Sequence, residues 1–322
     1  MPPVHEARRY LTPFGEGSHY LPEGPREVTL RKHPALAWVN IQDGPDATTG
    51  SIQVQYTIPG MDRFVMPAPE RPGFLLPTNL GPVVLVGLGK ELRHADLLEG
   101  QWSEPLARIP DDNPRTIIND AEIVPGGGAV VFGTKDTKFA DPIAHLYLYT
   151  VADDRVTVLR DGQTCSNGKV FARDDRGLIL FDIDTPTRTI TRNRLDVETR
   201  TLTAEGIAID LRHESAFPDG MCDCGDGTVV VAFYNPDFAE FGRAVRYRLA
   251  DGEPLDEWHT PGSPRVTCPL LVKRDDGVKL ILTTATEGMP GEMRQRCPNA
   301  GCLFIGDTTL TGVPPAEVVR VV

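Results

Sequence analysis

Long hydrophobic runs and clusters of basic residues are both missing from this 322-residue chain. No apolar stretch approaches the roughly 18 residues that mark a membrane-spanning helix. The first nine residues have no apolar core, so the sequence predicts no signal peptide, and we expect a cytoplasmic protein that does not bind membranes. Only seven residues are lysine and the net charge is -12, which argues against a nucleic-acid partner because phosphate binding needs a basic face.

Helical periodicity is also lacking, since no long segment places apolar residues every 3.6 positions. The 31 glycines and 29 prolines instead suit a chain that turns often. With 40% hydrophobic and 24% charged residues, the chain has the composition of an ordinary globular protein that can bury a large core. These features together favour an all-β fold.

An internal repeat is the strongest signal of architecture. Six short β-branched or aromatic runs end in small or polar residues, and matching positions lie 46 to 51 residues apart, at Val39, Val86, Phe132, Phe181, Ala232 and Leu282. A period near fifty that contains only strand and turn signals is typical of a four-stranded propeller blade. We therefore predict a single six-bladed β-propeller over residues 1–322. Residues 1–19 form an N-terminal extension or the closing segment, and Ala316 to Val322 is the alternative closing strand.

The six cysteines fit reduced thiols better than a disulfide framework. A zinc site is the alternative, and it would be built from Cys222, Cys224, Cys297 and Cys302. Their spacing matches no standard zinc finger, so we expect free thiols.

Four polar residues lie in register with the repeat. Asn119, Asn167 and Asp219 are 48 and 52 residues apart, and Glu23 precedes Asn119 by 96, or two blades. Innermost propeller strands line a common channel, so equivalent positions should meet at its axis. Two carboxylates and two amides form an oxygen cage for a hard divalent cation, with Ca²⁺ first and Mg²⁺, Mn²⁺ or Zn²⁺ as alternatives.

The same dipeptides have an ordinary structural interpretation. Asn-Gly, Asp-Gly and Glu-Gly-Pro sequences are common in turns between strands. We expect Asp219 to lie at a sharp Pro-Gly turn, facing outward, just before the buried strand that runs from Gly227 to Phe233. The repeat register favours the metal site over turns alone.

These motifs also carry a family resemblance, through Glu23-Gly24-Pro25, Asn119-Asp120, Ser166-Asn167-Gly168 and Pro218-Asp219-Gly220-Met221-Cys222. From about Tyr20 onward the chain resembles the SMP-30/gluconolactonase/luciferin-regenerating-enzyme family, with diisopropylfluorophosphatase-type propellers as more distant relatives. The resemblance implies one divalent metal at the top of the channel, held by Glu23, Asn167 and Asp219. Asn119 would be a fourth ligand or a contact through water and substrate. Asp219 would also be the general base, and Asp120 would orient Asn119 or meet the substrate.

The implied activity is that of a gluconolactonase-like carboxylic ester hydrolase of carbohydrate metabolism, which opens a small-molecule sugar lactone to its aldonic acid. A metal-dependent phosphotriesterase-like hydrolase and a non-enzymatic, calcium-stabilised binding propeller remain as alternatives. The sequence departs from the family at Ile117, where sugar-lactone hydrolases often carry arginine, and the nearest arginine is Arg115. Candidate substrate-binding residues are therefore Asn119, Asp120, Arg71, Lys135 and Asp136. The oligomeric state stays open.

Overall fold

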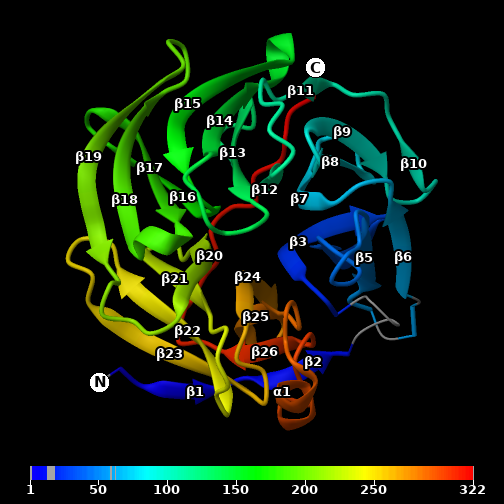
Figure 1. Cartoon of the computed structure of the whole chain (residues 1–322), viewed down its shortest axis with the longest axis vertical. Coiled ribbons are helices and arrows are strands. Elements are labelled where there is room, and N and C mark those ends of the chain that lie inside the picture. The colour runs from blue at the N-terminus through cyan, green and yellow to red at the C-terminus, as the bar shows by residue number, and fades with distance from the viewer. Residues whose placement is uncertain (1, 13–18, 59, 62, 322) are drawn as a thin grey trace.

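Six sheets of mainly antiparallel strands surround a common axis in the computed structural model, which describes residues 2–12, 19–58, 60–61 and 63–321 (Figure 1). The first three blades are β3 (Pro22–Leu30), β4 (His33–Asn40), β5 (Gly50–Tyr56) and β6 (Arg63–Ala68); β7 (Pro72–Pro77), β8 (Val83–Leu88), β9 (Glu91–Asp96) and β10 (Gln101–Trp102), with β11 (Ala107–Arg108) beside β9; and β12 (Thr116–Ile123), β13 (Ala129–Asp136), β14 (Ala144–Thr150) and β15 (Arg155–Gln163).

The other three blades complete the ring. They are β16 (Ser166–Asp174), β17 (Gly177–Asp184), β18 (Thr189–Asp196) and β19 (Thr201–Asp210); β20 (Phe217–Asp223), β21 (Thr228–Tyr234), β22 (Phe241–Arg248) and β23 (Pro254–Pro261); and β24 (Val266–Arg274), β25 (Gly277–Thr284) and β26 (Leu303–Asp307), with β2 (Arg8–Leu11) outermost. The predicted six-bladed propeller is thus confirmed.

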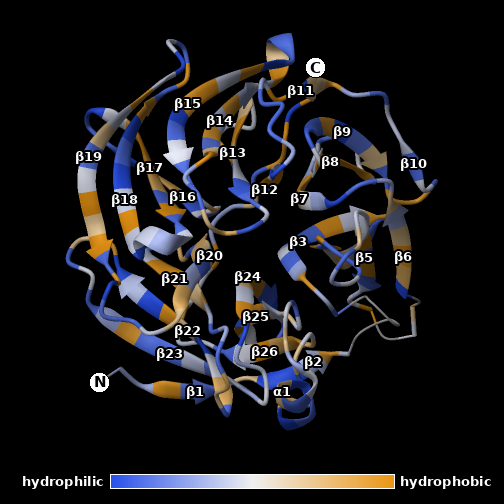
Figure 2. Cartoon of the chain, viewed as in Figure 1, coloured by the Kyte–Doolittle hydropathy of each residue, from blue (hydrophilic) through white to orange (hydrophobic). Residues whose placement is uncertain are grey.

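The hydrophobic repeat corresponds to one strand of each blade. Its six matching residues lie on β4, β8, β13, β17, β21 and β25, the second strand of every blade. These strands are buried almost throughout, because each blade packs between two neighbours, and they therefore read as continuous apolar runs. Figure 2 shows the orange apolar segments on the strands, with blue polar segments interspersed.

The N-terminal segment completes the sixth blade and adds a fifth strand to the fifth blade. Strand β2 pairs with β26, and β1 (Val4–Glu6) pairs with β23 in parallel. The C-terminal segment adds no strand to a blade within the part of the chain that the structure describes. Residues Val313 to Glu317 of this segment instead line a cavity together with residues of the inner strands. Further along, Val319 forms an isolated β-bridge with Thr78.

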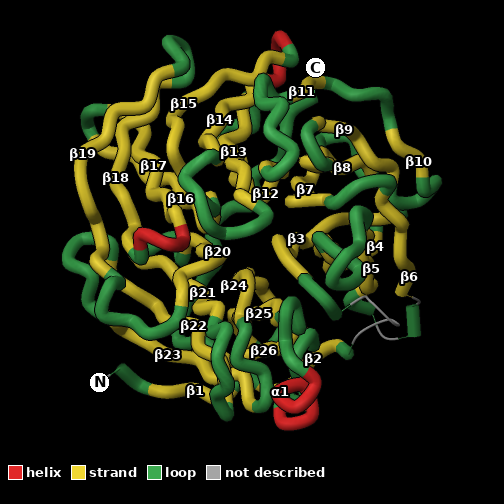
Figure 3. Tube along the Cα trace, in the orientation of Figure 1, coloured by secondary structure: helices red, strands yellow, loops and turns green. Residues whose placement is uncertain are grey.

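Helices are short in the described residues, and Figure 3 shows them in red. They are α1 (Gly291–Arg296) and the 3₁₀ turns η1 (Val151–Asp153) and η2 (Thr185–Thr187). None of these is long and apolar enough to cross a membrane.

Each inner strand breaks its register near its beginning. The shift in β20 falls between Pro218 and Met221, and equivalent shifts occur in β3, β7, β12, β16 and β24. The expectation that Asp219 faces outward at a turn is therefore wrong. Asp219 lies inside β20 at a β-bulge, where its side chain is re-aimed and buried, because turn-like sequences also provide the extra residue of a bulge.

Candidate metal centre

The beginnings of four inner strands bring the four predicted ligands to one end of the channel. Glu23 is on β3, Asn119 on β12, Asn167 on β16 and Asp219 on β20, and all four line one cavity of about 390 Å³. Asn119, Asn167 and Asp219 are 5%, 6% and 7% exposed, whereas Glu23 is partly buried. The inner strands all run in the same direction from the same end of the ring, which is why residues one blade apart meet here.

The two amides are held by hydrogen bonds. Asn119 Nδ2 donates to Asn167 Oδ1 at 3.0 Å and to the Ser166 carbonyl oxygen at 2.9 Å. Asn167 Nδ2 donates to Thr185 Oγ1 at 2.8 Å, and that hydroxyl donates to the Pro218 carbonyl at 3.0 Å. Within the described ranges, Asn119 Oδ1 accepts no hydrogen bond, so this oxygen remains free for a ligand in the cavity.

The two carboxylates, by contrast, have almost no hydrogen-bond donors. Glu23 Oε2 accepts only the neighbouring Gly24 N–H, at 3.1 Å, and no donor from the described residues reaches the Asp219 carboxylate. Burial raises the pKa of Glu23 well above its usual range, and the charges of Asp219 and Asp120 raise this pKa further. Burial likewise raises the pKa of Asp219, which Lys135 opposes.

Buried carboxylates without donors are unfavourable as anions unless a positive charge compensates them. Glu23 and Asp219 therefore form the acidic half of a site that fits a hard cation, and the free Asn119 oxygen adds a neutral ligand of the kind that Ca²⁺ accepts. The donor set has only two carboxylates, consistent with the lack of any group of three His, Cys, Asp or Glu suited to a metal ion among the described residues.

Two other predicted residues, Asp120 and Arg71, have hydrogen bonds within the protein. Asp120 Oδ1 accepts the Ala121 N–H at 2.7 Å, although its charge still acts on Glu23 and Asp219. Arg71 lines the cavity, and its Nε and Nη2 donate to the Ala47 carbonyl at 2.8 and 2.6 Å.

Asp136 supports the loop beside the cavity. Its oxygens accept hydrogen bonds from Arg115 and from the N–H groups of Lys138, Ala140 and Asp141. Burial raises the pKa of Asp136, but the Arg115 guanidinium and the backbone N–H donors outweigh burial and hold this pKa well below its usual range. Both carboxylate oxygens are thus used within the protein, and the guanidinium of Arg115 is directed to Asp136 and Asp141.

Several residues of the cavity wall were not predicted from the sequence, namely Thr185, Tyr234, Arg265 and Glu287. Thr185 opens η2 and Glu287 follows β25, so both belong to connections whose lengths vary from blade to blade. Arg265 offered one signal, since it lies two residues before Thr267, which follows Asp219 by 48 residues, or one blade.

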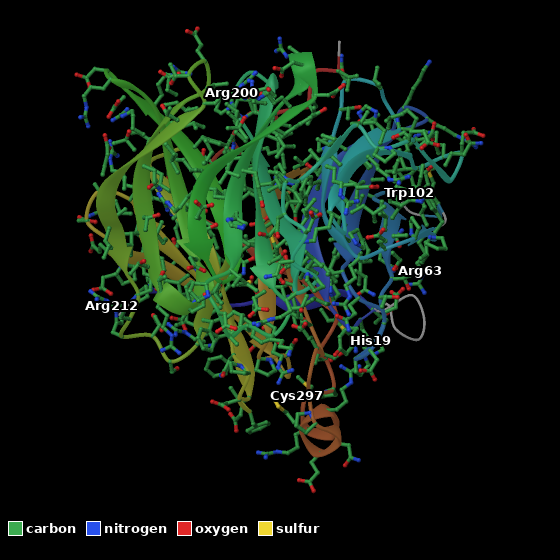
Figure 4. All side chains as sticks on the ribbon, turned by 45° about the horizontal axis from the view of Figure 1, so that its top comes forward. His19, Arg63, Trp102, Arg200, Arg212 and Cys297 are labelled. Carbon is green, nitrogen blue, oxygen red and sulfur yellow. The ribbon has the colours of Figure 1, made fainter. Side chains whose placement is uncertain are left out.

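The cysteines are free thiols. All six are unpaired, and five of them are buried. Cys297 follows α1 at the margin of the ring, as Figure 4 shows, whereas Cys222 lies on the inner strand β20. No cysteine-containing metal cluster occurs in the described part of the chain, so the alternative zinc site is not formed there.

Known proteins share this combination of fold and sequence. Residues 21–286, which contain all four predicted ligands, match the SMP-30/Gluconolactonase/LRE-like region. The chain belongs to this family. Regucalcin of Danio rerio is 27% identical over 207 residues, which cover 64% of this chain and 67% of that protein. Regucalcin of Homo sapiens is 26% identical over 223 residues, covering 66% and 71% of the two chains.

Solved structures of this SMP-30 family show the same fold. A calcium-binding regucalcin from Agrobacterium tumefaciens aligns with a TM-score of 0.80 at 22% identity, covering 99% of this chain and 100% of that one. A luciferin-regenerating enzyme aligns with a TM-score of 0.74 at 17% identity, covering 93% and 95%. At these identities the likeness establishes the propeller fold alone. The substrate has to be inferred from the residues that line the cavity.

Proposed function

We propose that this member of the SMP-30 family is a metal-dependent hydrolase that opens a sugar lactone to its aldonic acid. The observation that carries the proposal is the pair of carboxylates, Glu23 and Asp219, which line a cavity of about 390 Å³ and accept a single hydrogen bond between them from the described residues, that of the Gly24 N–H. Such a cavity is of a size to hold a small ligand. Membership of a family whose description includes gluconolactonase supports a lactone as the substrate.

The cation would be held by Glu23, Asn119, Asn167 and Asp219. When bound, a divalent ion supplies Lewis-acid polarisation of the lactone carbonyl and neutralises the developing oxyanion. Calcium is the first choice because the donor set contains only oxygen, and because the similar Agrobacterium tumefaciens protein is described as calcium-binding.

Asp219 is proposed as the general base. One carboxylate oxygen accepts a proton from the attacking water, whose oxygen bonds to the carbonyl carbon. The ring C–O bond then breaks, and the proton passes from Asp219 to the departing ring oxygen. Proton transfer of this kind contributes about 10²- to 10⁴-fold to the rate. Thr185 assists by fixing the Asn167 amide, which in turn orients Asn119.

The proposal is tested by measuring acid release from aldono-1,4- and 1,5-lactones. Protein stripped with chelator is refilled separately with Ca²⁺, Mg²⁺, Mn²⁺ or Zn²⁺. We expect turnover only after refilling, and a loss of at least about 100-fold in kcat for Asp219→Asn. Absence of turnover with every metal and every lactone would refute the lactonase assignment.

A further inference from the structure

The cavity wall has an excess of positive groups beyond the metal ligands. Its cationic side chains are Arg71, Lys135, Lys138 and Arg265. Its acidic side chains other than the two ligands are Asp136, which Arg115 already neutralises, and Glu287. A divalent cation would balance Glu23 and Asp219, so the remaining wall would be net positive.

Lys135 is the partly buried cationic residue of the wall that is free to act on a ligand, whereas Lys138 is exposed. It is the next-to-last residue of β13, its side chain lines the cavity, and it is partly buried. Its ammonium group forms no ion pair or hydrogen bond with the described residues. Its charge nevertheless reaches both Glu23 and Asp219, since it lowers the pKa of each. Lys135 therefore lies near the proposed metal ligands, and its ammonium group is not paired with another described residue.

Arg265 adds to the positive potential from a fixed position. It is 3% exposed and lies over the Tyr234 ring at 5.4 Å. Its Nη groups donate to the backbone carbonyls of Glu287 and Pro236, and its Nε is buried without a hydrogen-bond partner. Because these acceptors are neutral carbonyls, the guanidinium charge is not cancelled by a direct carboxylate contact.

We propose that the preferred lactone carries an anionic group, a carboxylate or a phosphate, and that Lys135 binds this group beside the metal. This inference rests on the proposed lactone hydrolysis and narrows its substrate class. A flexible lysine suits the role because its ammonium group can approach an anion from several directions as a point charge. Arg265 stays in place and makes the surrounding potential favourable for the anion.

The test compares kcat/KM for three lactones with metal-loaded protein. Glucono-1,5-lactone is neutral, glucaro-1,4-lactone carries a carboxylate, and 6-phosphoglucono-1,5-lactone carries a phosphate. We expect one of the charged lactones to exceed the neutral one by at least about 10-fold, as one charge-assisted hydrogen bond allows. The preferred member of the charged pair identifies the anion. The preference should decrease as salt is raised, because salt screens the contact.

Three variants separate this contact from a general effect on the fold. Lys135→Met should lose about 10- to 100-fold in kcat/KM for the preferred charged lactone and less than about 3-fold for the neutral one. Lys135→Arg should retain much of the preference. Lys273→Met is the control. It removes an exposed lysine near the C-terminal end of the inner strand β24, so its kcat/KM should match that of the wild type with all three substrates.

Equal kcat/KM for charged and neutral lactones, or an equal loss on all three in Lys135→Met, would overturn the inference while lactone hydrolysis stands. If no lactone is opened with any metal, the proposed lactone hydrolysis is refuted, and the anion contact needs a test that does not depend on turnover. Calorimetry with glucarate and calcium-loaded protein then decides the anion contact separately. Binding that Lys135→Met weakens supports it, and absence of such binding overturns it.

Discussion

Stability in the presence of calcium gives a direct measure of the candidate metal centre. If Glu23 and Asp219 are held together for a cation, the metal must stabilise the folded protein by linkage, since the unfolded chain lacks the site. At a calcium concentration of about 100 times Kd, this contribution is about 2.7 kcal/mol. An unfolding entropy of about 2.1 cal/mol/K per residue gives about 0.7 kcal/mol/K for the whole chain. The melting temperature should therefore rise by about 4 °C.

The informative variant is Asp219→Asn. It removes a buried carboxylate that accepts no hydrogen bond from the described residues and that lies near the Glu23 carboxylate, so the metal-free variant should melt about 1–2 °C above the metal-free wild type. This increase corresponds to about 1 kcal/mol of relieved electrostatic repulsion between the two carboxylates. That energy is smaller than the roughly 1.4 kcal/mol that one unit of pKa shift represents. The same variant should lose nearly all of the calcium-induced rise, because the site retains a single carboxylate. Differential scanning calorimetry with and without calcium measures both quantities.

Asp120→Asn serves as the matched control. It also removes a negative charge that raises the pKa of Glu23 and Asp219, but its Oδ1 can still accept the Ala121 N–H. We expect this variant to keep the calcium-induced rise within about 1 °C. The reasoning is refuted if Asp219→Asn keeps the full rise, or if it is less stable than the wild type when both are free of metal.

Three further changes test the packing and charge around the channel. Gly168→Ala would place a Cβ 2.6 Å from Met221 Cβ and 2.9 Å from the Asp219 carbonyl, so it should lower Tm by about 2–4 °C, whereas Gly128→Ala meets nothing within 4 Å and should change Tm by less than about 1 °C. Arg115→Met leaves Asp136 with only its three backbone N–H donors and no positive partner, so it should lower the midpoint of urea unfolding, and adding Asp136→Asn should restore part of the loss. Burial raises the pKa of Asp182 to about 6, against the opposing charges of Lys169 and Arg160. Because the folded pKa lies above the unfolded one, this carboxyl stabilises the protein fully below about pH 4, and its contribution is lost as pH rises through 6. Urea unfolding from pH 4 to 7 should show that loss in the wild type relative to Asp182→Asn, and parallel pH profiles would contradict it.

The fold and the convergence of the four candidate ligand residues on one cavity could be predicted because both follow the blade period. The apolar repeat marks the second strands, which are buried between blades, and polar residues one period apart mark the axis. The closing strands could not be chosen from sequence, since β1 and β2 are short and their pairing partners, β23 and β26, lie more than 240 residues away. The wall residues Thr185 and Glu287 were not predicted because they lie in the connections that follow the second strands β17 and β25, and not at the inner-strand positions that hold the candidate ligands.

The bulge at Asp219 explains why turn-like dipeptides appear in the middle of inner strands. Strands that converge on an axis come so close that a side chain facing the next blade cannot be accommodated. A Cβ at Gly220 would lie 2.8 Å from the Thr267 carbonyl oxygen of the sixth blade, and one at Gly168 would meet Met221 of the fifth. Glycine directly after Asn167 and Asp219 thus lets neighbouring backbones touch, while the bulge turns the preceding polar side chain toward the axis. The same backbone contacts fix the separation of the candidate ligand residues, so the candidate metal centre depends on how the blades pack as much as on the residues that would bind the ion.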